Sequence, residues 1–174
     1  EESAAVEWLP VFSAGKTVTG QVRQVCALDC FFETDGPAEL YYALGATSRI
    51  DAFALQHTPL QQRLVLQSMH SCQYLPFFNL VTGSGGVLIG LGFTGAGEAA
   101  FTPQEGGIRV TVKMPQTDFY LYPGEQVRNI RVLLQFWQGE RRRSFNLLRS
   151  HLLRHVIPAD ENGEAYPPVC CSSW

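Results

Sequence analysis

The histidines His151 and His155 have the spacing of a metal-binding pair on a helix. Four residues apart, their side chains would share one helical face. Zinc proteases use this spacing with a glutamate directly after the first histidine, where this chain has Leu152. A closed zinc site also needs four convergent ligands, and Cys170 and Cys171, as neighbours on a strand, would point to opposite faces. We therefore expect polar, half-exposed histidines and no metal site.

The stretch GLGFTG formally matches the dinucleotide-binding fingerprint, with Gly90, Gly92 and Gly95 at its three glycine positions. The fingerprint works only when a helix opens at the third glycine, because the helix N-terminus holds the pyrophosphate. Here Pro103 follows within eight residues and further strand-like sequence comes after it. We therefore expect a close-packed strand and a glycine-rich turn, with no nucleotide or other cofactor.

The acidic residues form no evident catalytic pair. A glycosidase needs two carboxylates that face each other across one sugar. Asp29, Asp51 and Asp118 lie in strand-rich sequence, and their spacing pairs none of them with another. The Gly-x-Ser-x-Gly elbow of serine hydrolases is also absent from the sequence.

The composition excludes several classes of function. The 174 residues have a net charge of −3, which indicates neither nucleic-acid binding nor a polybasic membrane anchor, and no apolar run could cross a bilayer. The N-terminal EESAAVEW lacks a signal-like core and an initiator methionine, so we expect a processed or truncated chain and favour a cytoplasmic location over secretion. The five cysteines are expected to be buried free thiols.

The first three quarters of the chain have the pattern of an antiparallel β-sandwich. Short apolar runs such as ELYYAL, FFNLV and GVLIGLGF end at turn-forming residues. In GIRVTVK, the residues Ile108, Val110 and Val112 alternate with polar ones, as in a strand with one buried face. Pro123 and Gly124 in YPGE suit a type II turn, and VRNIRVLLQFW after it is expected to form one long strand.

The pattern changes at Gly139. Phe145, Leu148, Leu152 and Val156 recur at spacings of three and four, which predicts one amphipathic helix over 140–157, ended by Pro158. The arginines at 141–143 stand where the helix dipole disfavours cations, and they are expected to form a solvated face or to pair with acidic residues of another domain. The final VCCSSW again has the composition of a strand.

Three segments in this order resemble glycoside hydrolase family 36, the bacterial α-galactosidase-like proteins. They are SCQYLPFFNLVTGSGGVLIGLGFTGAGEAAF, LYPGEQVRNIRVLLQFWQGERRRSFNLLRSHLLRHVIP and PPVCCSSW. The resemblance implies a mainly β fold. An antiparallel, galactose mutarotase-like β-supersandwich would span 1–138, a linker helix and connection 139–166, and the first strand of a (β/α)8 barrel 167–174. Its marker residues are expected to be structural: Pro123, Gly124, Glu125, Arg128, Asn146 and Arg149.

The resemblance also implies a function. The parent protein would be a retaining α-galactosidase whose two catalytic aspartates lie on later barrel strands, so this chain alone would be non-catalytic. It would support the barrel and shape its sugar pocket, with an α-galactoside as the carbohydrate partner. Trp174 at the barrel rim and Phe93, where relatives carry tryptophan, are the expected substrate-binding residues. Relatives also have an aromatic residue at the position of Gly97, where this chain lacks a ring that could stack on a sugar face.

The alternative function is a stand-alone carbohydrate-binding or adhesive β-sandwich. Such a module would close its own fold at the C-terminus and would have no use for the helix and last strand. With no barrel against them, the helix and the strand at 169–174 would leave apolar surface uncovered. We therefore also expect the isolated chain to form a homo-oligomer through its C-terminal strand, or to have a mobile C-terminal strand.

Overall fold

The computed structural model describes residues 4–46, 49–68, 73–92 and 97–163. These residues form twelve strands and one α-helix. The strands are β1 (Ala4–Trp8), β2 (Val11–Ser13), β3 (Val22–Glu33), β4 (Ala38–Leu44), β5 (Leu55–Pro59), β6 (Leu64–Ser68), β7 (Tyr74–Thr82), β8 (Gly85–Leu91), β9 (Gly97–Gln104), β10 (Gly107–Phe119), β11 (Gln126–Arg128) and β12 (Val132–Gln138), and the helix is α1 (Arg141–His155). None of the described helical residues forms a segment long and apolar enough to cross a membrane.

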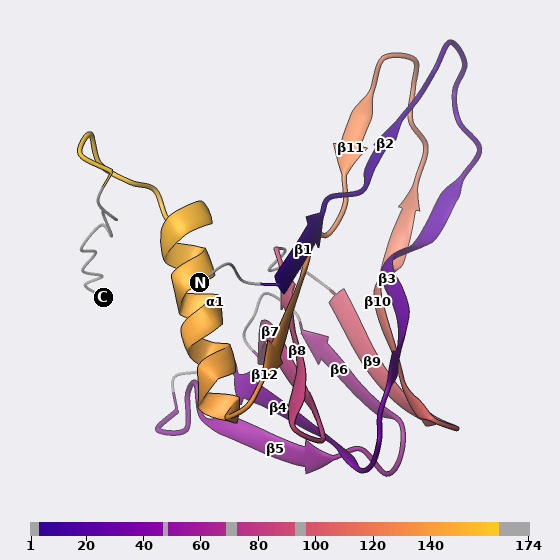
Figure 1. The fold of residues 1–174 in the computed structure, drawn as a ribbon. Helices are drawn as coiled ribbons and strands as arrows, with labels where there is room; N and C mark the ends of the chain where they lie inside the picture. Colours follow the sequence, from indigo (N-terminus) through magenta and orange to yellow (C-terminus); the bar gives the residue numbers. More distant parts are fainter. Residues whose placement is uncertain (1–3, 47–48, 69–72, 93–96, 164–174) are drawn as a thin grey trace.

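The strands form two large sheets and a two-stranded ribbon. The six-stranded sheet has the order β1-β12-β8-β7-β4-β5, and the four-stranded sheet has the order β3-β10-β9-β6. Strands β2 and β11 pair separately. All pairings are antiparallel, which confirms the predicted sandwich class. The helix α1 lies beside the six-stranded sheet, on the side away from β3, β10 and β9 (Figure 1).

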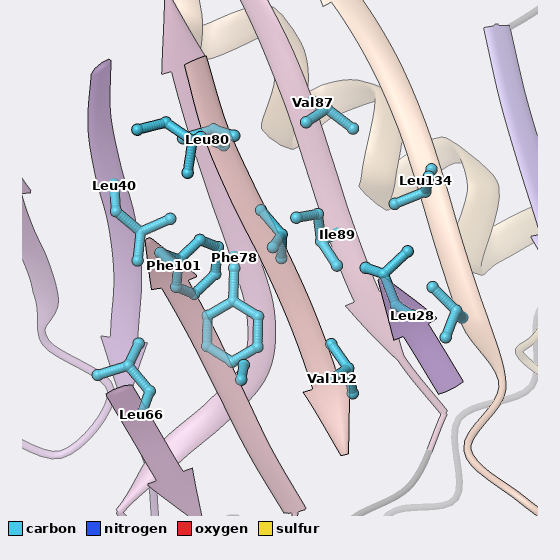
Figure 2. Packing of buried hydrophobic residues seen from close by; sticks show 14 of the residues in the cluster. Leu28, Leu40, Leu66, Phe78, Leu80, Val87, Ile89, Phe101, Val112 and Leu134 are labelled. Atoms are coloured by element: carbon cyan, nitrogen blue, oxygen red, sulfur yellow. The ribbon is translucent and has the colours of Figure 1, made fainter. Parts of the chain in front are cut away.

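The core lies between the two large sheets (Figure 2). Leu40, Leu80 and Ile89 of the six-stranded sheet are completely buried, as is Phe101 of the four-stranded sheet. The rings of Phe78 and Phe101 meet edge to face across the sandwich, 5.6 Å apart. Burying a side chain of this size contributes about 1.5–3 kcal/mol. This apolar layer therefore provides most of the stability that holds the outer faces in place.

Strand β10 has the predicted alternation. Ile108, Val110 and Val112 are buried at 0–3% exposure, whereas Arg109 is exposed on the other face. Pairing with β3 shifts by one residue after Val112, and the indole nitrogen of Trp8 donates to the carbonyl of Ala27 beside that shift at 3.0 Å. The first strand of the chain is thus tied to the opposite sheet.

The predicted type II turn is present and has a second bond. The Glu125 amide donates to the Tyr122 carbonyl at 2.9 Å, and Gly124 has a φ of +84°, which a type II turn requires at that position. The Glu125 carboxylate also accepts from the Tyr122 amide at 2.7 Å. The turn connects the segment after β10 to β11, which pairs with β2, and these strands form an arm that extends above the sandwich with the start of β3 (Figure 1).

The prediction of one long strand over VRNIRVLLQFW is wrong. The chain forms β11 in the ribbon, breaks at 129–131, and continues as β12 in the six-stranded sheet. At the break the Asn129 amide donates to the Pro10 carbonyl at 2.9 Å, and the Asn129 side chain accepts from the Ile130 amide. Asparagine readily forms such local side-chain bonds in place of a ladder, and this lets the strand change sheets.

The single predicted helix is confirmed within the described residues, but its buried face differs from the prediction. Residue Ser144 is completely buried against the six-stranded sheet, whereas Phe145 and Val156 are 38% and 54% exposed. Leu148 and Leu152 are half-buried. The face is rotated because the Asn79 side chain of the sheet donates a hydrogen bond to Ser144. The helix ends where the amides of Val156 and Ile157 both donate to the Leu152 carbonyl, just before Pro158.

Candidate functional site

A buried polar network joins α1 to the outer face of the six-stranded sheet. The Asn79 side chain on β7 donates to Ser144 Oγ at 2.8 Å and accepts from Trp137 Nε1 at 2.9 Å. Ser144 Oγ donates in turn to the Arg141 carbonyl at 2.6 Å, within the first turn of the helix. Each of these side-chain groups is buried, so each needs its partner. The network fixes both the position and the rotation of the helix.

Two further features shape the surface beneath the helix. Gly86 on β8 leaves room for the Trp137 ring, because a Cβ at that position would lie 2.9 Å from Trp137 Cζ2. Gln135 on β12 is 1% exposed, and neither of its amide atoms has a hydrogen-bond partner among the described residues. The face of the sheet that packs against the helix therefore contains both polar and apolar side chains.

An aromatic and charged cluster lies at the start of the helix. The Arg141 guanidinium lies 4.0 Å from the centre of the Tyr41 ring, and the His57 ring stacks on Tyr41 at 4.5 Å. Glu39 accepts from the Tyr41 hydroxyl at 3.1 Å and lies 3.2 Å from His57 Nε2. Partial desolvation, then the bond to Glu39, raises the pKa of Tyr41. This cluster accounts for the position of a cation at the helix N-terminus, because the tyrosine ring attracts it.

An open cleft of about 1180 Å³ lies between β1 and α1, along the helix from Arg143 to His155. At its base Glu7 receives a hydrogen bond from Arg131 at 2.7 Å, and His151 Nε2 lies 3.5 Å from the other Glu7 oxygen. His151 is only 12% exposed and its ring lies 5.0 Å from that of His155. The cleft is polar and partly cationic, and Glu7 is its one carboxylate among the lining residues.

The predicted histidine pair shares a face, as its spacing indicated, but the two side chains differ. His155 is exposed, whereas His151 is more buried than expected because it lies against Glu7. Within the described part of the chain, no three histidine, cysteine, aspartate or glutamate side chains converge on a point that could hold a metal ion.

The structure brings no two of the candidate aspartates together, and each pairs with an arginine. Asp29 binds Arg109 through two hydrogen bonds of 2.8 and 2.7 Å, and these bonds lower its pKa. The other two pairs are longer: Asp51 lies 3.1 Å from Arg49, and Asp118 lies 3.8 Å from Arg23. A catalytic acid needs a pKa raised toward neutrality, which is the opposite of the shift at Asp29.

The glycine motif begins on a strand. Gly90 belongs to β8, and a Cβ at Gly92 would lie 2.9 Å from the Arg131 side chain. Gly95 and Phe93 lie outside the described residues, and the chain resumes as strand β9, not as a helix. Gly97 is the first residue of β9.

The expected structural residues fall in two places. Pro123, Gly124 and Glu125 form the turn at the arm. The exposed Arg128 on β11 lines an apolar pocket of about 330 Å³ beneath the arm, and its guanidinium has no bonded partner in the ranges described. Asn146 and Arg149 are both exposed on α1, and Asn146 lines the cleft. Trp174 lies outside the described residues, as does the whole expected barrel strand.

The cysteines are only partly as expected. Cys30 is half-buried against the core, and desolvation, with the nearby Asp29 charge, raises the pKa of its thiol. The expectation of burial is wrong for Cys26, which is exposed. The shift in pairing between β3 and β10 turns it to the outer face, opposite Lys113. The other three cysteines lie outside the described residues.

Sequence reasoning missed the two side chains that attach the helix, Asn79 and Tyr41, and the buried Gln135 beneath it. The available signal was a polar residue inside an apolar run, as in FFNLV and LLQFW. Most buried polar residues are hydrogen-bonded, and two elements distant in sequence, β12 and α1, supply the partners of Asn79.

Comparison with known proteins identifies the fold. No protein-family model matches the chain, and no curated protein sequence matches it significantly. Among solved structures, the galactosidase domain of the α-galactosidase–sucrose kinase AgaSK superposes with a TM-score of 0.72 over 95% of this chain, at 16% identity. The α-galactosidase from Lactobacillus brevis superposes with a TM-score of 0.63 over 74%, also at 16% identity. The GH36 α-galactosidase AgaA from Geobacillus stearothermophilus gives 0.49 over 64%, at 24% identity.

The likeness covers only part of these enzymes. The chain spans 24% of the AgaSK galactosidase domain and 19% of the Lactobacillus brevis enzyme. It therefore has a fold that also occurs within α-galactosidases, as about a quarter or a fifth of their length.

Proposed function

We propose that this chain is the non-catalytic β-sandwich domain of a retaining, family 36 type α-galactosidase, which supports a catalytic barrel and borders its sugar pocket. The observation that carries the proposal is the superposition on the AgaSK galactosidase domain, which includes α1 because it covers 95% of the chain. A stand-alone sandwich has no need of such a helix on its outer face.

The chemistry of the described carboxylates supports a non-catalytic role. Glycoside hydrolysis needs an acid whose pKa is raised and a second carboxylate across the scissile bond. Asp29 instead has a lowered pKa and a bidentate arginine partner. Asp118 on β10 is also paired with an arginine, Arg23 of β3, and Asp51 is paired with Arg49 of its own loop. We infer that acid and nucleophile come from elsewhere on a longer polypeptide.

The coding sequence downstream of Trp174 tests this proposal at once. We expect alternating strand and helix patterns over a barrel length, with an aspartate at the C-terminal end of two of the strands. An early stop codon, or a downstream region without that alternation, contradicts the proposal.

The exposed tyrosines of the arm favour a second candidate, a carbohydrate-binding module. Tyr120 and Tyr122 are 53% and 61% exposed, and flat rings of this kind stack on sugar faces. Titration of the 174-residue chain with galactose and melibiose, followed by nuclear magnetic resonance, distinguishes the two. Saturable shifts that disappear in Tyr122→Ala favour the binding module; unchanged spectra favour the proposed support domain.

A further inference from the structure

Strand β1 forms one edge of the six-stranded sheet and is bonded on one side only. It pairs with β12, and no other backbone hydrogen bond reaches it among the described residues. An antiparallel strand directs about half of its N–H and C=O groups to each side, so those on the outer side of β1 are free to bond a further strand. Proline, lysine or a bulge normally protects such an edge, and β1, with the sequence AAVEW, has none of them. The opposite edge strand, β5, ends in Pro59.

The inner face of β1 is incompletely covered. Val6 lies directly opposite Leu134 of β12, and opposite residues of an antiparallel pair project to the same face. Leu134 belongs to the core and is 6% exposed, yet Val6 is 54% exposed. The sandwich is therefore open beside β1, and a further strand on this edge could cover Val6 with an apolar side chain.

The outer face of the same edge borders a cationic wall. Ala5 and Glu7 project to this face and line the cleft between β1 and α1 (Figure 1). The helix contributes Arg143 and Arg154 to the cleft, whereas the one carboxylate among its lining residues, that of Glu7, is already bonded to Arg131. Arg154 has no hydrogen bond or ion pair in the ranges described. The wall therefore favours an anionic neighbour.

The wall and the strand also have similar lengths. Arg143 and Arg154 are 11 positions apart in α1, which corresponds to about 16 Å along a helix axis. The five residues of β1 span roughly the same distance in extended conformation. A peptide strand paired along β1 could therefore bring side chains near both arginines.

We propose that β1 binds an extended peptide of alternating apolar and acidic residues, which joins the six-stranded sheet as a further strand. Because side chains alternate between the two faces of a strand, its apolar residues cover Val6 and its acidic residues face Arg143 and Arg154. Main-chain hydrogen bonds supply affinity in this mode of recognition, and the alternate side chains supply specificity. The proposal does not rest on the proposed function.

A second copy of the chain fits this edge less well. Its β1 would offer only Ala5 and Glu7 to the cleft, and the carboxylate of Glu7 is already bonded to Arg131. A two-fold contact is also self-complementary, so it would place two arginine-bearing helices on the same face of the joined sheet. The acidic peptide instead supplies the charge that the cleft lacks.

Fluorescence anisotropy tests the proposal on the 174-residue chain. The probe is a fluorescein-labelled peptide, Thr-Val-Glu-Val-Glu-Val-Glu-Thr, and the control peptide has lysine at each glutamate position. We expect saturable binding of the glutamate peptide and binding at least about tenfold weaker for the lysine peptide. Arg154→Glu should weaken binding of the glutamate peptide about tenfold. The matched control is Arg142→Glu, the same charge change outside the cleft, which should alter binding by less than about twofold because solvent screens it.

A second pair of variants tests the strand edge itself. Val6→Lys should abolish binding, because a lysine on the inner face of an edge strand opposes a further apolar strand. Its control is Val18→Lys, at a valine that is 47% exposed and lies outside the strands, and this change should leave binding intact. Hydrogen exchange measured by mass spectrometry should show slower exchange of the β1 amides when the peptide is bound.

Each other outcome overturns the proposal. No saturable binding, equal binding of the two peptides, or unchanged binding by Arg154→Glu would show that the edge and the wall do not act together. Slow exchange of every β1 amide in the free chain would show that the edge is already paired. A dimer in light scattering that Val6→Lys dissociates would assign the edge to a second copy. Hydrolysis of p-nitrophenyl α-galactoside by the complete polypeptide tests the proposed function separately, and its result leaves the peptide site unaffected.

Discussion

Replacing Asn79 with alanine should destabilise the sandwich far more than replacing an exposed amide side chain with alanine would. Asn79 is 2% exposed and holds two hydrogen bonds, one from Trp137 and one to Ser144. Each bond contributes about 1 kcal/mol net, and a buried indole N–H left without an acceptor costs about 1–3 kcal/mol. Because Ser144 keeps its bond to the Arg141 carbonyl, most of the cost falls on Trp137. We expect the free energy of unfolding to fall by about 2–4 kcal/mol.

Urea unfolding followed by tryptophan fluorescence measures this change directly. For a domain of this size, about 1 kcal/mol shifts Tm by roughly 2–4 °C, so Asn79→Ala should lower Tm by roughly 4–16 °C. Ser144→Ala should cost less, and the two changes should be non-additive because the residues are in contact. The matched control is Gln67→Ala, which removes an exposed amide bond to Glu98 of the same 2.8 Å length and should change stability by less than about 0.5 kcal/mol. If Asn79→Ala behaves like this control, the network does not hold the helix.

Three further outcomes are expected. Gly86→Ala should destabilise the chain by about 1–3 kcal/mol or more in the same assay, because its Cβ would meet Leu80 O and the Trp137 ring, whereas Gly36→Ala has free space and should be neutral within about 1 kcal/mol. Because the pKa of Asp29 is lowered in the folded chain, its contribution to folding stability is complete above the ordinary carboxyl pKa near 3.8 and is lost as pH falls below that value. Arg109→Ala should raise the pKa of Asp29, which carboxyl NMR measures. Cys30 should react with iodoacetamide more slowly than glutathione does at pH 8, because its thiol pKa is raised and it is half-buried; an equal rate by mass spectrometry would contradict this.

Local patterns predicted the local structure well. The alternation in β10 and the proline–glycine turn depend on a few neighbouring residues, and both are present. The extent of the helix was also predictable, because Gly139, with its φ of +90°, and Pro158 bound it. In each case the residues that determine the local structure lie within a few positions of one another in the sequence.

The errors arose where distant residues decide the outcome. The long strand breaks because Asn129 bonds to Pro10, more than a hundred residues away in the chain. The helix turns Ser144 and not Phe145 to the sheet because Asn79 requires a partner. Apolar periodicity alone cannot show that a sheet presents polar groups to a helix. It therefore placed on the buried side two residues, Phe145 and Val156, that are 38% and 54% exposed.

The central claim is that this chain is a non-catalytic part of an α-galactosidase. The most direct measurement is the hydrolysis of p-nitrophenyl α-galactoside by two purified samples, the 174-residue chain and the complete polypeptide that contains it. The account predicts release of p-nitrophenol by the complete polypeptide and none by the chain alone, because Asp29, Asp51 and Asp118 are each paired with an arginine and the acid and nucleophile are proposed to lie elsewhere. Turnover by the chain alone that a single substitution of one of its own aspartates or glutamates abolishes would contradict the claim.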